Sequence, residues 1–256
     1  MKKQIFENNI KDYYSELIKN ENHRFQSWEH CYISFRNAFK KKSLDEKEKN
    51  ILSLHLAFYL ASWGMYRGSS FILQKDYKIF YPIIHLLFSN KEYFKETYIE
   101  SLLKNKDDNE TDQYVKKYCD LDNDLSIILE KIRSSVKGDV ESKVSYTLKT
   151  KILLGIFGCV PAYDRFFEKG IRDKKKEHDL IIAYSKNGLK KLIKFAKKNV
   201  DELDKIKKHI SNIQNNNSNL NKVEYPYMKL MDMLFWKIGF DLELEEERLK
   251  KENSSK

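Results

Sequence analysis

Apolar residues recur at helical spacing along most of the chain, and this pattern predicts an all-α fold. Between residues 50 and 63 the large apolar side chains lie three or four positions apart, so they share one face of a helix. Ser43 and Glu46 form the S-x-x-E pattern of a capping box before this helix, and Gly64 supplies a stop after it. We therefore expect a helix that is buried along one face.

The same spacing predicts further helices and a domain organisation. Helical patterns cover 4–18, 28–40, 141–157 and 227–239, and the stretches 76–104 and 110–136 each read as two or more helices. Gly158 and Pro161 break the helix over 141–157, and the Asn-rich stretch 212–221 reads as a loop. We expect one compact multi-helix domain over 1–240, with lobes at about 1–136 and 137–240 around a basic cleft. The charged tail over 241–256 is expected to fray into solvent.

The amino-acid composition supports a helical fold. The 256 residues include 8 Gly and 3 Pro, about 4% against a usual value near 12%. Few positions are thus suited to the turns that an all-β fold needs. Hydrophobic residues make up 41% of the chain, with 15 Phe and 16 Tyr, which is enough for a sizeable core and excludes a disordered protein.

Targeting signals and metal motifs are missing from the sequence. No apolar stretch near the amino terminus resembles a secretion signal, and the longest apolar stretch, 51–66, is shorter than the roughly 20 residues of a membrane span. The three Cys lie far apart and the six His show no HExxH or HxxxH spacing. We expect a cytoplasmic protein with no membrane contact, no metal site and no cofactor.

An excess of positive charge points to an acidic partner. The chain carries 48 Lys and Arg against 38 Asp and Glu, a formal net charge of +10. The segment 172–208 alone holds thirteen basic and six acidic residues, and so supplies most of this excess. Because phosphates attract such a surface, nucleic acid is the expected partner. The sequence does not identify protein partners.

One segment suggests a chemistry. Residues 149–167 read KTKILLGIFGCVPAYDRFF, an apolar helix followed by a Gly/Pro loop and an aspartate that opens a new helix. This order resembles the core of the helix-hairpin-helix DNA glycosylases, over about residues 141–167. The resemblance carries the loop glycine to Gly158, the proline to Pro161 and the catalytic acid to Asp164. It implies a DNA-binding, base-excising protein in which Asp164 stabilises positive charge on the sugar and positions water.

The match also implies which reaction steps and contacts to expect. The hairpin itself corresponds at best to Val136–Gly138, with one glycine where the family has two. Ser145 and Tyr146 stand where strand-cutting members carry a lysine, so the enzyme should release a base without cutting the strand. A flipped base leaves a space for a wedge, for which Tyr163, Trp28 and Trp63 are candidates. The expected nucleic-acid contacts are Ser145, Lys149, Thr150, Lys151, Tyr163, Arg165, Lys190, Lys191 and Lys194.

Other functions fit parts of the same sequence. If Asp164 only caps a helix, the chain is a non-enzymatic basic helical module that binds nucleic acid or protein. Arg24 with His30, and Arg172 with His178, resemble the Arg-x4-6-His pattern of helical ribonucleases of the HEPN kind. Residues six apart do not share a helix face, so this is the weakest of the three hypotheses. The three Trp lie within helical patterns, and we expect them in the core rather than against bases.

Overall fold

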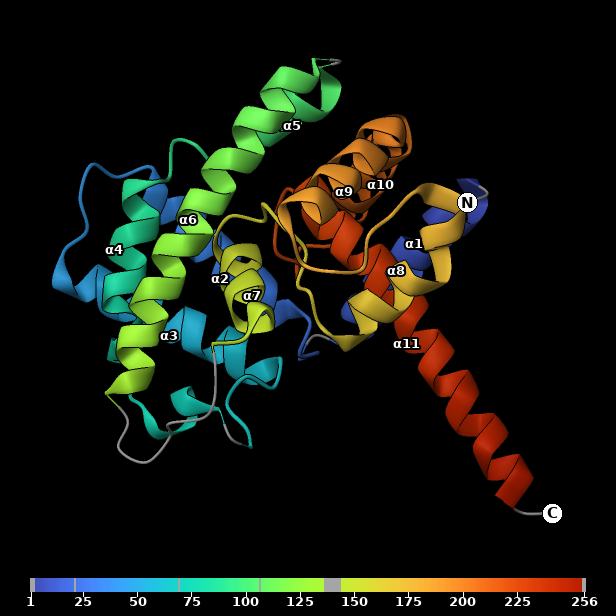
Figure 1. The fold of residues 1–256 in the computed structure, drawn as a ribbon, viewed down its shortest axis with the longest axis horizontal. Coiled ribbons are helices and arrows are strands. Elements are labelled where there is room, and N and C mark those ends of the chain that lie inside the picture. The colour runs from blue at the N-terminus through green and yellow to red at the C-terminus, as the bar shows by residue number, and fades with distance from the viewer. Residues whose placement is uncertain (1–2, 21, 69, 106, 136–143, 255–256) are drawn as a thin grey trace.

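The computed structural model describes residues 3–20, 22–68, 70–105, 107–135 and 144–254 (Figure 1). Within these ranges the protein has eleven α-helices, two short 3₁₀ helices and no strand, which confirms the all-α prediction. The helices are α1 (Lys3–Lys19), α2 (Gln26–Phe39), α3 (Glu46–Ser62), η1 (Phe71–Gln74), η2 (Tyr77–Phe80), α4 (Tyr81–Ser89), α5 (Glu96–Lys104), α6 (Asp108–Ser134), α7 (Tyr146–Ile156), α8 (Arg165–His178), α9 (Lys186–Lys198), α10 (Val200–Asn216) and α11 (Tyr227–Ser254).

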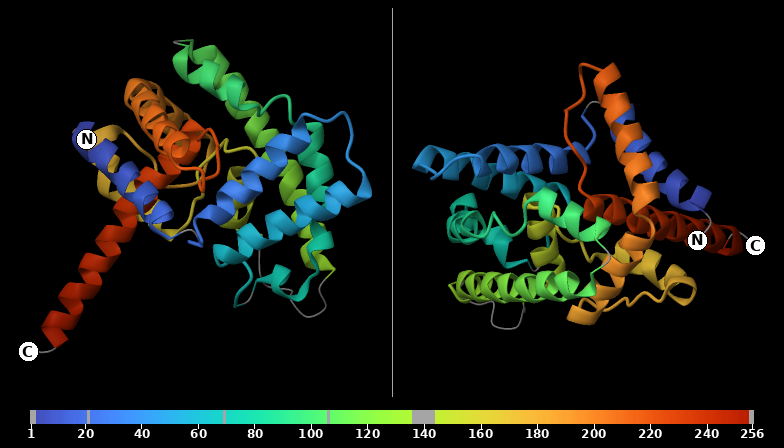
Figure 2. Two further views of the ribbon diagram at one scale, coloured as in Figure 1. Left: turned by 180° about the vertical axis from the view of Figure 1, so that it is seen from behind. Right: turned by 90° about the horizontal axis from the view of Figure 1, so that it is seen from above.

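The helices pack as two lobes that share one continuous hydrophobic core (Figures 1 and 2). We call α2 to α7 the central lobe, and α1 together with α8 to α11 the terminal lobe. The predicted division at residue 136 is therefore different from the observed grouping. Residues 148–156 of α7 are buried apart from Lys149, so this helix lies between α2, α3 and α6 in the central lobe. The first half of α11 is also buried on almost all sides. Helix α1 packs against α11 and therefore belongs to the terminal lobe.

Helices α3, α6 and α10 differ in part from the sequence prediction. The capping box of α3 uses Asp45 and Glu48, two residues later than predicted, because Asp45 Oδ1 accepts from Glu48 N while Glu48 Oε2 accepts from Asp45 N. Gly64 ends the helix as predicted, with a positive φ of 73°. The stretch 110–136 was expected to hold two or more helices, but it lies largely within the single 27-residue helix α6. Helix α10 extends to Asn216, into the predicted Asn-rich loop.

The prediction that 241–256 frays is wrong for residues 241–254, because α11 continues to Ser254. Residues 245–254 are exposed, and Figure 1 shows this end of the helix extending away from both lobes. Ion pairs one turn apart support it: Arg248 with Glu245 at 2.8 Å, and Lys237 with Asp241 at 2.6 Å. Such pairs stabilise an exposed helix, and α11 begins in a buried segment that provides its nucleus.

Two glycines allow α8 and α11 to cross at very short range. A Cβ atom on Gly170 would lie 2.0 Å from the carbonyl oxygen of Phe235, and one on Gly239 would lie 1.9 Å from that of Phe166. Both obstacles are backbone atoms, so no side-chain movement relieves them. This crossing fixes the first turns of α8, the helix that Asp164 opens.

None of the described helices is both long and apolar enough to cross a lipid bilayer. The three cysteines are free thiols; Cys31 and Cys159 are buried and Cys119 is partly buried.

Candidate functional site at the junction of the lobes

Asp164 lies where the chain passes from the central lobe to the terminal lobe. Helix α7 ends at Ile156, Gly158 takes a φ of 62°, and an extended segment through Pro161 leads to Asp164. Asp164 is itself extended, and its Oδ1 accepts hydrogen bonds from the backbone N–H groups of Phe166 at 3.2 Å and Phe167 at 3.1 Å. The predicted role of Asp164 as a helix N-cap is therefore confirmed.

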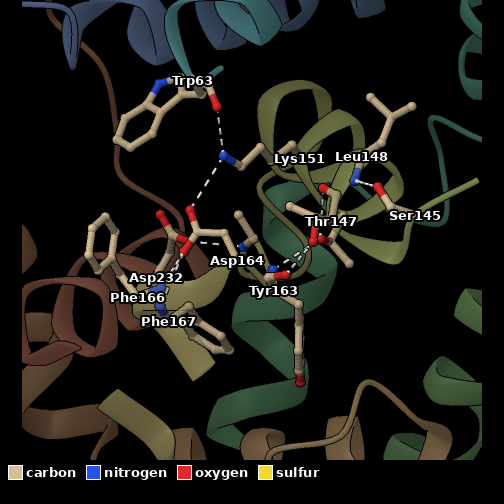
Figure 3. Close-up of polar contacts among 12 residues, drawn as sticks. Trp63, Ser145, Thr147, Leu148, Lys151, Tyr163, Asp164, Phe166, Phe167 and Asp232 are labelled. Atoms are coloured by element: carbon tan, nitrogen blue, oxygen red, sulfur yellow. Dashed lines mark hydrogen bonds and ion pairs between the residues drawn. The ribbon is translucent and has the colours of Figure 1, made fainter. Parts of the chain in front are cut away.

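Lys151 engages the other carboxylate oxygen of Asp164 (Figure 3). Its Nζ lies 3.3 Å from Asp164 Oδ2 and donates to the carbonyl oxygen of Trp63 at 3.1 Å. The Lys151 side chain is 5% exposed and that of Asp164 is 14% exposed. Burial lowers the pKa of Lys151 below its ordinary value, and the carboxylate of Asp164 opposes that shift. The pair thus joins the end of α3, the middle of α7 and the start of α8.

A second ion pair lies deeper in the same junction. Lys229 Nζ lies 2.8 Å from Asp232 Oδ2, and the backbone N–H of Ala162 donates to Asp232 Oδ1 at 2.9 Å. Both side chains are almost fully buried. Lys229 also lies 5.1 Å from the ring centroid of Trp28 and 5.2 Å from that of Tyr13, within the range of cation–π attraction. Burial raises the pKa of Asp232, and Lys229 opposes this rise.

This second pair was not predicted from the sequence. Lys229 and Asp232 lie one turn apart in the segment 227–236 of α11, which is otherwise apolar. Two opposite charges at that spacing inside an apolar run are the one signal that the sequence offers, because charges are rarely buried unless they are paired.

Three arginines, two in the loops that follow α1 and α3 and one at the start of α8, lie near the junction of the lobes. The guanidinium carbon of Arg24 lies 5.3 Å from the Trp63 ring, and that of Arg165 lies 4.4 Å from the Phe166 ring. Arg67 packs beside Gly64, and its charge helps to lower the pKa of Lys151. All three arginines are exposed. We call Arg24, Arg67 and Arg165 the arginine rim; only Arg165 was predicted from the sequence.

Most other residues predicted around Asp164 have internal partners. Ser145 caps α7, and Lys149 Nζ lies 2.7 Å from Asp122 Oδ2. Thr150 is fully buried, where its hydroxyl accepts from the backbone N–H of Tyr163 at 3.0 Å. Tyr163 is buried as well. In this conformation Thr150, Tyr163 and Lys151 offer almost no surface to a nucleic acid, and Tyr163 is not placed as a wedge.

The predicted lysines of α9 gather at a different place. A pocket of about 290 Å³ is lined by Thr111, Asp112, Asn187, Lys190, Lys191, Lys194 and Lys197; we call it the lysine pocket. It lies between the first turn of α6 and α9, so each lobe contributes to it. The structure thus brings Lys190, Lys191 and Lys194 together, but none of the residues paired with Asp164 lines this pocket.

The residues of the ribonuclease pattern have other surroundings. Arg24 packs over Trp63, whereas His30 lines an apolar pocket with His55 and Phe58. The ring of His178 lies 5.2 Å from that of Phe195. Trp28 and Trp236 are buried, as the core prediction required, and Trp63 is half-buried at the junction.

The predicted hairpin at Val136–Gly138 lies outside the described residues. Among the residues that the structure describes, no group of three His, Cys, Asp or Glu side chains is placed to hold a metal ion. Comparison with known proteins finds no matching family model, no similar curated protein and no similar solved structure.

Proposed function

We propose that the protein is a helical module that binds nucleic acid through phosphate contacts, with Asp164 serving mainly to join its two lobes. The observation that carries the proposal is that both Asp164 oxygens already have partners, while exposed lysines collect on α9. A carboxylate that caps one helix and pairs with a buried ammonium group on another stabilises the packing of the two helices. The basic surface of the terminal lobe then supplies the function.

Two exposed lysines of α9 test the phosphate contacts. Lys194 and Lys198 are exposed, and neither has an ion-pair partner among the described residues. Each phosphate contact contributes about −0.9 to the slope of log K against log salt for duplex DNA. The double variant Lys194→Gln/Lys198→Gln should therefore flatten that slope by up to about 1.8.

Lys42 and Lys47 provide the matched control. Both are exposed on the central lobe, and neither has an ion-pair partner in the described part of the chain. Lys42→Gln/Lys47→Gln removes the same charge and should leave the slope close to that of the wild type. Binding should be measured by fluorescence anisotropy on duplex and single-stranded DNA between 50 and 200 mM salt. Equal slopes for both double variants, or absence of binding to either DNA, would contradict the proposal.

Base excision at Asp164 is the second candidate, and the arginine rim favours it. The acid lies at the lobe junction and is 14% exposed, and the exposed arginines of the rim at this junction suit phosphates. In this function the carboxylate stabilises the positive charge that develops on the sugar as the base leaves. Lys151 would contact one oxygen of the carboxylate, and the two N–H groups of α8 would hold the other in place.

Asp164→Asn separates the two candidates. Asn keeps an acceptor oxygen for the cap but removes the carboxylate charge. If the protein excises bases, the variant should retain DNA binding while base release falls about 10²- to 10³-fold, as for loss of one electrostatic catalytic group. DNA with modified, damaged and mispaired bases should be assayed for free base and for strand breaks.

The same assay gives the outcomes that decide between them. The excision hypothesis requires that the wild type releases a base and leaves the abasic strand uncut until alkali is added. Equal release by wild type and Asp164→Asn, or a covalent protein–DNA adduct trapped by borohydride, would reject Asp164 as the sole catalytic acid. Binding without base release leaves the binding module as the function.

A further inference from the structure

The lysine pocket has the composition of a site for a tetrahedral anion. Four of its seven lining residues are the lysines Lys190, Lys191, Lys194 and Lys197, against one acidic residue, Asp112. Lys190 pairs with Asp112 at 2.6 Å, and Lys191 pairs with Asp179, which lies outside the lining. Lys197 donates to the carbonyl oxygen of Asp107 at 3.2 Å. The lining therefore retains a net positive charge after its own ion pair is taken into account.

Thr111 provides an observation that is independent of the charge. Its side chain is 7% exposed and lines the pocket, and its hydroxyl has no hydrogen-bond partner. A buried hydroxyl without a partner is destabilising, so such groups commonly mark a place where a ligand or water completes the bonding. The four lysines that line the same pocket offer only donors, so a partner that suits both the hydroxyl and the lysines is an anionic oxygen.

The secondary structure adds to the positive potential. Thr111 and Asp112 lie in the first turn of α6, a helix of 27 residues, and helix N-termini carry a partial positive charge. Asp107 already caps this end by accepting from Asn109 N at 2.8 Å. Asn187, whose amide is a further donor, lies in the first turn of α9.

We infer that the lysine pocket binds one phosphate group, held by Lys194 and its neighbouring lysines and by the Thr111 hydroxyl. The volume of about 290 Å³ is roughly ten times the 30 Å³ that a water molecule occupies in the liquid, so it accommodates a phosphate and part of the molecule that carries it. The inference rests on the proposed nucleic-acid binding only for the carrier of the phosphate, which we take to be a nucleic-acid strand. The same oxygens also occur in inorganic phosphate and in mononucleotides.

Two substitutions test the contacts, and a third outside the pocket controls for charge. Lys194→Gln should weaken phosphate binding about tenfold, since it removes a charge-assisted hydrogen bond. Thr111→Val should weaken it about fivefold. The same variant should raise the melting temperature of the ligand-free protein, because it removes the unsatisfied hydroxyl. Lys42→Gln removes one exposed charge from the central lobe, outside the pocket, and should leave phosphate affinity unchanged.

The titration should compare inorganic phosphate, a nucleoside 5′-monophosphate and a single-stranded oligonucleotide, all at constant ionic strength. Thermal shift suits the small probes and calorimetry suits the oligonucleotide. Weakened binding of phosphate and oligonucleotide in Lys194→Gln and Thr111→Val, but not in Lys42→Gln, supports a phosphate site used by nucleic acid. Weakened binding of the small probes alone supports the site and overturns the nucleic-acid carrier. Equal losses in all three variants, or no saturable effect of phosphate on the wild type, would overturn the site.

Discussion

Breaking the contact between Lys151 and Asp164 should uncouple the two lobes in a measurable way. The test is a double-mutant cycle built from Lys151→Met, Asp164→Asn and the combined variant. Met fills most of the volume of the lysine stem, and Asn retains an oxygen that accepts from Phe166 and Phe167. Each substitution therefore removes charge while preserving shape, which a double-mutant cycle requires.

The structure sets the expected magnitudes. Removing one partner of a buried ion pair costs about 3–5 kcal/mol. Because Asp164 keeps two N–H donors and 14% of its side-chain surface, Lys151→Met should lie near the lower end, about 3 kcal/mol. Asp164→Asn retains a helix cap that is typically worth about 1 kcal/mol, so its cost should be smaller, about 2 kcal/mol. The combined variant has no unpaired charge and should cost about 1–3 kcal/mol less than the sum.

The free energy of unfolding should be measured by urea denaturation at pH 7, followed by circular dichroism and by tryptophan fluorescence. Trp63, whose carbonyl binds Lys151, reports the junction, whereas circular dichroism reports all helices. A coupling energy below about 0.5 kcal/mol would refute the reasoning, since that is the limit at which distant sites already appear additive. Asp164 would then be a helix cap whose ion pair adds nothing.

Three further expectations test other parts of the structure. Gly239→Ala should destabilise the fold by about 3 kcal/mol or more, because backbone atoms of α8 block the new methyl group; a loss below 1 kcal/mol in urea denaturation would disprove the close crossing. Lys229→Met should lower the free energy of unfolding by about 3–5 kcal/mol, and adding Asp232→Leu should recover most of that loss. If the second substitution recovers nothing, the pair is not energetically isolated. Burial lowers the pKa of His55, and the charge of His30 lowers it further, so the unfolded chain binds a proton at this residue more readily than the folded chain does. Stability should therefore fall as pH drops through the usual histidine value of about 6.5, and less steeply in His55→Gln; unchanged slopes would exclude this contribution.

The local features of the fold were predictable from the sequence because they depend on neighbouring residues. The helical periodicity before Gly64, the break at Gly158 and the cap at Asp164 each involve contacts within a few positions of the chain. The capping box was displaced from Ser43 to Asp45, because several polar residues precede α3 and the sequence does not rank them.

The grouping of helices and the partners of Asp164 were not predictable in the same way. Lys151 appears in the sequence as one more basic residue near the motif, and its burial follows only from the packing of α7 between other helices. Asp232 lies 70 residues from Ala162, its hydrogen-bond partner. The crossing of Gly170 with Gly239 depends equally on distant segments. Local patterns do not encode which distant faces meet.

The position of α1 in the terminal lobe has a consequence for how the chain folds as it is made. The partners of α1 are chiefly α10 and α11, which are synthesised long after α1. The central lobe is contiguous, so its helices can dock while synthesis continues. At about 5–20 residues per second, the roughly two hundred residues between α1 and α11 take about 10–40 s to translate. Throughout that interval Tyr13 can stack on Phe25, but the rest of the apolar face of α1, with Phe6 and Ile10, lacks the later helices that cover it in the folded protein, which makes newly synthesised α1 a target for chaperones.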